Sequence, residues 1–95
     1  MLFEVTRALR RSDDELANEI KDVISAGLLE LERIGVDVDV QNIENNKNKL
    51  IVRCIVLYAR SEFDYNQQGE RYLNQFLKLS DALSRSSDYK EKTYE

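Results

Sequence analysis

The chain has 95 residues, which suits one small domain, and its 14 Lys and Arg against 18 Asp and Glu give a net charge of −4. With no His and one Cys, it cannot use an imidazole base, build a zinc site from the usual ligands or form a disulfide within one chain. No apolar run approaches the roughly 20 residues that a bilayer span needs. We therefore expect one domain over residues 1–95 that is not an enzyme and takes no cofactor, and the lone Cys54 fits a reducing compartment.

The absence of Pro favours a chain that is mostly helix, because an interior Pro costs a helix about 3 kcal/mol. Residues 2–11 are predicted to form a short helical arm, with Thr6 as a candidate cap. A basic cluster of Arg7, Arg10 and Arg11 lies in this arm and is expected to be solvated.

The first long helix is expected from about residue 13 to residue 34, after a capping box with Ser12 as N-cap and Glu15 at N3. Gly35 is a natural C-terminal stop. One face of this helix carries apolar residues at helical spacing together with a glycine: Leu16, Ile20, Val23, Ile24, Gly27, Leu31 and Ile34. Because Gly27 weakens the helix by about 1 kcal/mol relative to Ala, we expect another backbone to approach closely there.

Residues 36–48 have a different character. The strict alternation in Val36-Asp37-Val38-Asp39-Val40 is typical of a strand, which either pairs with another edge or only extends as a loop. Four Asn residues follow in 42–48, and this composition favours a polar turn in which one Asn caps the next helix.

Two further helices are predicted, over about 48–63 and 68–84. The first is the most apolar segment, with one face of Ile51, Cys54, Ile55 and Tyr58 and a second strip of Val52, Val56 and Ala59. The inner face of the second is expected to hold Tyr72, Leu73, Phe76, Leu79, Ser80 and Leu83. Cys54 is expected to be an inert core residue. The fold class is therefore all-α: three main helices in a core over 12–84, an N-terminal arm, an extended 36–48 loop and a polar tail over 85–95.

Two charged surfaces are candidates for function. Glu15, Glu19 and Asp22 project from the first long helix, opposite its apolar face, and they form either a solvated face or the counterpart of basic groups. Glu15 and Glu19 are like charges four residues apart, which is mildly destabilising without such a counterpart.

A narrow basic ridge on the second long helix is the other surface. At about 100° per residue, Lys49, Arg53 and Arg60 fall on one side of that helix. They are solvated, meet the acidic face of another subunit, or bind phosphate. Leu29, which points away from the main apolar face, and the Val52–Val56 strip indicate an association surface.

Three stretches carry a resemblance to a known family. In residues 6–24, a turn ending in Leu9-Arg10 leads into Asp13-Asp14-Glu15-Leu16 and an amphipathic helix. Residues 55–66 (Ile-Val-Leu-Tyr-Ala-Arg-Ser-Glu-Phe-Asp-Tyr-Asn) form a helix that closes on an aromatic and a tight turn. Residues 72–89 add Leu77-Lys78-Leu79-Ser80 and the ending Ser87-Asp88-Tyr89. Together they resemble the small head–tail connector proteins of long-tailed bacteriophages, also called head-completion, adaptor or DNA-packaging proteins.

One position and one segment depart from that family. The family often has Gly in the turn after the aromatic, where this chain has Asp64. Because Asp tolerates the left-handed conformation better than most residues, we expect the turn to form. The 36–48 segment is also longer and more strand-like than the family's usual linker.

The resemblance implies a virion subunit of a ring, commonly a dodecamer, that lies beneath the portal and joins the DNA-filled head to the tail. Its partners would be its own copies, the portal protein and a tail-side stopper or terminator protein. DNA would pass through the channel without sequence-specific recognition, no membrane would be involved, and assembly would take place in the host cytoplasm.

A ring needs head-to-tail contacts that close. We hypothesise that Glu15, Glu19 or Asp22 of one subunit meets Lys49, Arg53 or Arg60 of its neighbour, with Val52 and Val56 in the same interface. Asp88, Tyr89 and Tyr94 of the tail are candidate anchors for a partner protein. The alternative from another class is a small helical DNA-binding regulator, since three short helices can form a helix-turn-helix.

Overall fold

A computed structural model describes residues 1–10, 16–86 and 88–89, and all the regular structure in these residues is helical. The elements are α1 (Leu2–Ala8), α2 (Ala17–Arg33), the 3-10 turn η2 (Ile43–Asn45), α3 (Lys49–Glu62), the 3-10 turn η3 (Tyr65–Gln67) and α4 (Gly69–Arg85). The all-α prediction is confirmed. The predicted count of three main helices is not matched exactly, because the N-terminal arm forms a fourth helix, α1, that belongs to the core.

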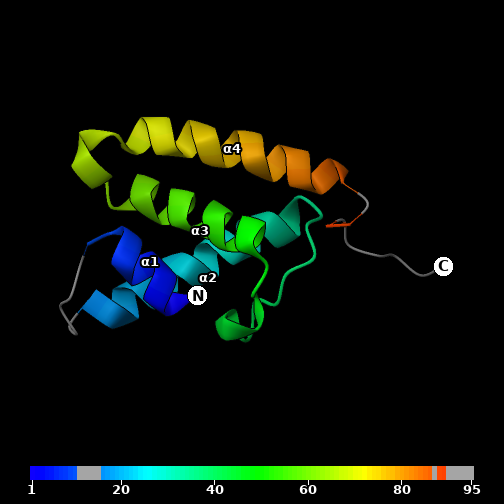
Figure 1. The fold of residues 1–95 in the computed structure, drawn as a ribbon, viewed down its shortest axis with the longest axis horizontal. Helices are drawn as coiled ribbons and strands as arrows, with labels where there is room; N and C mark the ends of the chain where they lie inside the picture. The colour runs from blue at the N-terminus through cyan, green and yellow to red at the C-terminus, as the bar shows by residue number, and fades with distance from the viewer. Residues whose placement is uncertain (11–15, 87, 90–95) are drawn as a thin grey trace.

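The helices are arranged around α3 (Figure 1). α4 lies along one side of α3, while α1 and α2 pack on the other, and α1 also contacts α2. The molecule is elongated and flat, measuring 46 × 26 × 18 Å. This arrangement leaves α4 at the outer edge with α3 as its main neighbour.

The centre of the core lies among α1, α2 and α3. The largest fully buried side chains are Val5, Ile20, Ile24, Leu28, Leu31, Val36, Cys54 and Ile55, and α4 supplies none of them. α4 covers the edge of this core with Phe76 and Leu83 instead. Leu73, which was expected on the inner face of α4, is 39% exposed, so that prediction is wrong.

α1 is a core helix rather than a solvated arm. Met1, Val5 and Leu9 repeat every four residues and are all buried, which places one stripe of α1 against the rest of the molecule. Arg7 and Arg10 are exposed, as expected, and Arg11 lies outside the described residues. The structure therefore accounts for α1 by apolar packing, with its charges on the outer side.

The ends of the long helices follow the sequence signals. α2 ends in a Schellman motif, in which the Val36 N–H donates to the Leu31 carbonyl at 2.9 Å and the Gly35 N–H donates to the Glu32 carbonyl at 3.0 Å. Gly35 has φ +94°, which only Gly adopts without strain. Asn48 caps α3 by accepting from the Leu50 N–H at 2.9 Å. The capping box expected at Ser12 and Glu15 lies outside the described residues.

Gly27 permits a close approach, but of a side chain rather than a backbone. A Cβ at this position would lie 2.9 Å from Tyr58 Cδ1 and 3.0 Å from Ile55 Cδ1. The Tyr58 ring therefore rests directly on the α2 backbone, and its other contacts include Phe76 of α4, with ring centroids 5.2 Å apart. The expectation that another backbone approaches Gly27 is therefore wrong, because the group that approaches is an aromatic side chain.

Candidate subunit interface

The acidic surface of α2 is solvent-exposed where the structure describes it. Glu19 and Asp22 are both exposed, and they lie away from the buried Ile20 and Ile24 on the same helix. Leu29, 53% exposed, lies close to Asp22 in angle around the helix axis, so the surface is not purely charged. Glu15, the third predicted member, lies outside the described residues.

The basic surface of α3 is also exposed, with apolar neighbours. Lys49 and Arg53 are exposed, and Val52 and Val56, which lie on the same side of the helix, are half-buried. The half-burial of these valines leaves part of each side chain in water. Two members of the predicted ridge and two of the predicted apolar strip are thus adjacent on one face, whereas Ala59, the third member of the strip, is fully buried.

Helical geometry places Asp22 and Lys49 on opposite sides of the α2–α3 contact. α2 and α3 meet where Gly27 contacts Tyr58, so that contact marks the inner side of each helix. At about 100° per residue, Asp22 lies on the far side of α2 from Gly27, and Lys49 lies on the far side of α3 from Tyr58. One molecule therefore presents an acidic face and a basic face on opposite sides, which suits a head-to-tail contact between copies.

Arg60 differs from the other two members of the predicted ridge, because its guanidinium is engaged within the chain. Its Nη2 donates to the Ala8 carbonyl at 3.3 Å, and its Cζ lies 5.1 Å from the Tyr65 ring centroid and 5.4 Å from that of Tyr72. Arg60 Nε is a buried nitrogen with no hydrogen-bond partner in the described structure. Arg60 thus joins α1, α3 and α4 through cation–π contacts and one hydrogen bond, and the ridge that faces outward consists of Lys49 and Arg53.

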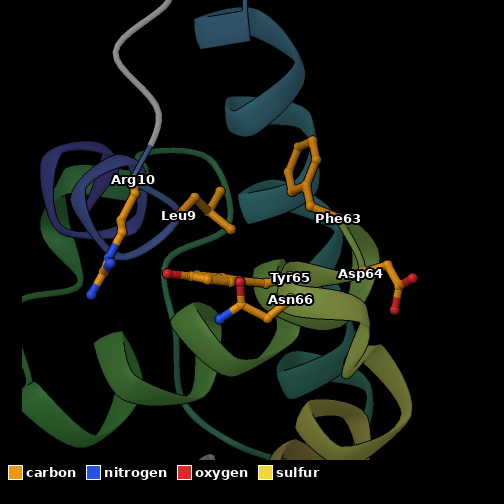
Figure 2. Close-up of a pocket in the computed structure, with 6 residues that line it drawn as sticks. All are labelled: Leu9, Arg10, Phe63, Asp64, Tyr65 and Asn66. Carbon is orange, nitrogen blue, oxygen red and sulfur yellow. The ribbon is translucent and has the colours of Figure 1, made fainter.

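A pocket of about 270 Å³ lies between the end of α1 and the α3–α4 turn (Figure 2). Its lining residues are Leu9, Arg10, Phe63, Asp64, Tyr65 and Asn66. Figure 2 shows Tyr65 extending toward α1, while the carboxylate of Asp64 turns away. Sequence reasoning did not find this pocket, because α1 and the turn are far apart in the chain and no motif links them.

The turn that forms this pocket depends on Asp64. Asp64 adopts the left-handed conformation with φ 48° and ψ 47°, as expected for a position where the resembled family often has Gly. Its Oδ1 accepts a hydrogen bond from the Gly69 N–H at 2.9 Å, at the start of α4. The carboxylate therefore fastens the first turn of α4 to the end of α3.

Cys54 is fully buried among apolar side chains. Burial raises the pKa of its thiol to about 12, so the thiol stays protonated at neutral pH. This agrees with an inert core residue. In the described part of the chain, no group of three or more His, Cys, Asp or Glu side chains could hold a metal ion.

Of the predicted tail anchors, Tyr89 packs against the core and Asp88 is exposed. Tyr89 is half-buried against the core, and its carbonyl accepts a hydrogen bond from the Asp37 N–H at 2.8 Å. Among the described residues, this is the strand-like hydrogen bond that the alternating valine segment makes, and the rest of the segment is a loop. Asp88 is exposed, and Tyr94 lies outside the described residues.

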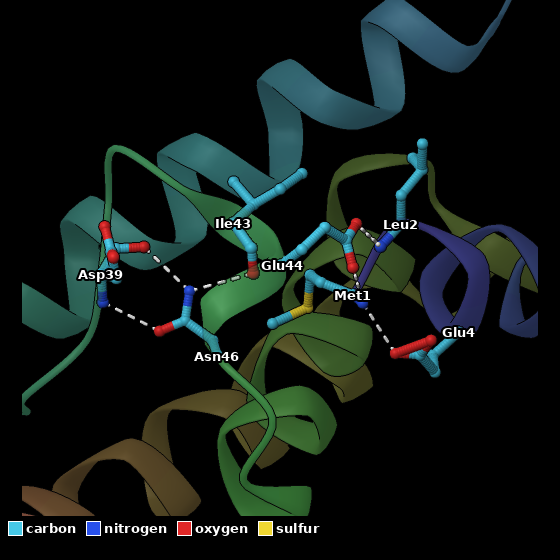
Figure 3. Close-up of polar contacts among 7 residues, drawn as sticks. All are labelled: Met1, Leu2, Glu4, Asp39, Ile43, Glu44 and Asn46. Atoms are coloured by element: carbon cyan, nitrogen blue, oxygen red, sulfur yellow. Dashed lines mark hydrogen bonds and ion pairs between the residues drawn. The ribbon is translucent and has the colours of Figure 1, made fainter.

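Polar contacts organise the 36–48 segment and fasten it to α1 (Figure 3). The Asn46 side chain accepts from the Asp39 N–H at 2.8 Å and donates to the carbonyls of Asp39 and Ile43. Glu44 reaches α1, with its Oε1 2.6 Å from the Met1 amino group and its Oε2 accepting from the Leu2 N–H at 3.1 Å. Glu4 also pairs with the Met1 amino group, at 2.8 Å.

The Glu44 ion pair predicts a pH dependence of stability. The hydrogen bond from the Met1 amine lowers the pKa of Glu44 below 4.5. Burial lowers the pKa of the amine, but hydrogen bonds and charges of Glu4 and Glu44 outweigh it and raise that pKa above 8.0. The carboxyl contribution is present above pH 4.5 and lost as pH falls through the lowered pKa; the amine contribution is present below pH 8.0 and lost as pH rises through the raised pKa.

Glu44→Gln is therefore expected to lower the free energy of unfolding at neutral pH by about 1 kcal/mol or less, because the carboxylate is largely exposed. The difference from the unmodified chain should shrink toward acid and toward alkali in urea unfolding curves. Glu32→Gln, an exposed change on α2, is the control and should show no such window. A Glu44→Gln effect that is constant with pH would contradict the role of the ion pair.

Comparison with known proteins leaves the question of family open. The chain matches no family model, no curated protein and no solved structure. Among the helices that the structure describes, none combines the length and the apolar character needed to cross a membrane.

Proposed function

We propose that this chain is a structural subunit of a bacteriophage virion, a head–tail connector that forms a ring beneath the portal. The observation that carries the proposal is the placement of an acidic face on α2 and a basic, partly apolar face on α3 at opposite sides of one molecule. Surfaces of this kind favour a heterologous contact, which forms a ring where the rotation between copies closes. The portal protein and a tail-side stopper or terminator are the proposed neighbours.

The proposed contact combines charge and apolar surface. Asp22 and Glu19 of one copy face Lys49 and Arg53 of the next, and Leu29 lies against the Val52–Val56 strip. Exposed ion pairs contribute only about 0–1 kcal/mol each, so they set the register of the ring. Burial of apolar surface, at about 25 cal/mol per Å², supplies most of the affinity.

Charge reversal at Arg53 tests this contact. Arg53→Glu is expected to impair ring formation while leaving the thermal unfolding of the monomer unchanged, because Arg53 is exposed on α3. Rings are measured by negative-stain microscopy and by particle mass in solution, with and without portal protein.

Two further variants sharpen the result. Asp22→Lys combined with Arg53→Glu reverses one charge on each side of the contact, which re-creates an opposite-charge pair, and should restore rings. Lys78→Glu reverses an exposed charge on α4, outside the proposed contact, and should leave rings intact. Normal rings from Arg53→Glu alone would refute the assignment of this interface.

The chain's C-terminal end is proposed to bind the portal or a tail protein, with Asp88, Tyr89 and Tyr94 as contacts. Removing residues 86–95 is expected to leave rings intact and to prevent the joining of heads to tails, counted by electron microscopy in an assembly reaction. Removing only 90–95 retains the Asp37–Tyr89 hydrogen bond and separates the contribution of Tyr94 from that of Tyr89. Unimpaired joining after the longer truncation would refute this role.

A further inference from the structure

α4 lies at the outer edge of the molecule and is connected to α3 by one short turn. The largest fully buried side chains come from α1, α2, α3 and Val36, and α4 supplies none of them. α4 contacts chiefly α3, along the outer edge of the molecule (Figure 1). Phe76, Ser80 and Leu83 of α4 are nevertheless buried and need a partner surface. α4 therefore docks mainly on one surface, that of α3.

The turn that returns α4 onto α3 is strained. Three of its residues other than glycine have positive φ: Asp64 at 48°, Asn66 at 55° and Gln67 at 59°. Asp and Asn tolerate the left-handed region, but each L-residue there costs roughly 1–2 kcal/mol, and Gln67 lacks the short polar side chain that eases the cost. This strain exists only while the turn is closed.

Two contacts hold the turn closed. Asp64 Oδ1 accepts the Gly69 N–H at 2.9 Å, and Gly69 fits so closely that an added Cβ would lie 2.9 Å from the Ser61 carbonyl oxygen. Arg60 of α3 lies over the rings of both Tyr65 of the turn and Tyr72 of α4. The closed turn thus balances backbone strain against a small number of local contacts.

We propose that α4 exchanges between two copies of this chain, so that the segment 64–68 opens and α4 of each copy packs on α3 of the other. The occupant of the α3 surface is then an identical helix, and the Tyr58–Phe76 contact re-forms between chains. The exchange costs little because the native packing is retained, while the strain at Asn66 and Gln67 is released in both copies. This inference does not depend on the proposed function.

The experiment measures mass and the identity of the contacts together. The full chain is incubated across the micromolar to millimolar range and examined by size-exclusion chromatography with light scattering. Dimers prepared from equal amounts of isotope-labelled and unlabelled chains are then examined by isotope-filtered NMR. Contacts between Tyr58 of one chain and Phe76 of the other are expected in the dimer. A chain that stays monomeric throughout, or a dimer in which this contact stays within each chain, would overturn the proposal.

Matched hinge variants provide the second measurement. Gln67→Gly relieves the left-handed strain in the closed turn and is expected to raise the dissociation constant of the dimer by about tenfold or more. Asn66→Ala removes a residue that tolerates this conformation and should lower the constant by about tenfold. Both residues are exposed and distant in sequence from Tyr58 and Phe76. Equal dissociation constants for the two variants would also overturn the proposal. A dimer that forms through surface contacts, without exchange of α4, should not depend on strain in the turn.

Discussion

Val5→Asp is expected to lower the free energy of unfolding by about 3 kcal/mol or more, because it places a carboxylate where the side chain is fully buried. Val5 lies on the stripe of α1 that also carries Met1 and Leu9, and both neighbours are buried. A charge at this point has no basic partner on the same stripe, so the core must open or α1 must detach. Urea unfolding followed by circular dichroism measures the loss.

Phe3→Asp is the matched control, since it makes the same acidic substitution two residues earlier in the same helix. Phe3 is 71% exposed, and an acidic residue is favoured near a helix N-terminus, so stability should change by about 0.5 kcal/mol or less. The substitution at Val5 is therefore expected to cost more stability than the one at Phe3, although valine is the smaller residue. Equal effects of the two variants would show that α1 is peripheral to the core.

The end of α2 and the start of α3 could be predicted well because local signals determine them. Asn48 and Gly35 act through their own side chain or backbone conformation, and both perform the predicted capping roles. Spacing alone also placed Ile20, Ile24 and Leu31 in the core. Leu28 is equally buried but was not in the predicted face, since α1 and α3 together cover a wider arc of α2 than one partner would.

The packing of α1 could not be predicted from its sequence, because a segment of seven residues has too little apolar periodicity to separate a core helix from an arm. Its burial depends on α2 and α3, which begin later in the chain. The helical positions of Lys49, Arg53 and Arg60 were predicted equally well, yet Arg60 alone meets Ala8, Tyr65 and Tyr72. Angles around one helix axis carry no information about which other elements lie beside it.

Gly27→Val is expected to lower the free energy of unfolding by about 2 kcal/mol, despite the better intrinsic helix propensity of valine. The first added carbon would lie 2.9 Å from Tyr58 Cδ1 and 3.0 Å from Ile55 Cδ1. Tyr58 cannot retreat freely, because its ring also packs against Phe76 with 5.2 Å between centroids. The added side chain on α2 would therefore press on Tyr58, and Tyr58 would in turn press on Phe76 of α4.

Tyr58 offers a direct reporter of that displacement. Burial raises the pKa of its hydroxyl, and the negative charges of Glu62 and Glu30 raise it further. If valine at position 27 pushes the ring toward solvent, the pKa of Tyr58 should move back toward its usual value in a spectrophotometric titration, alongside the loss of stability in urea. Leu29→Val makes a β-branched substitution at an exposed site of the same helix and should leave that pKa unchanged. If Gly27→Val left both the free energy of unfolding and the pKa of Tyr58 unchanged, the Tyr58 ring would not rest on α2. The Gly27–Tyr58 contact could then no longer be used to define the inner sides of α2 and α3.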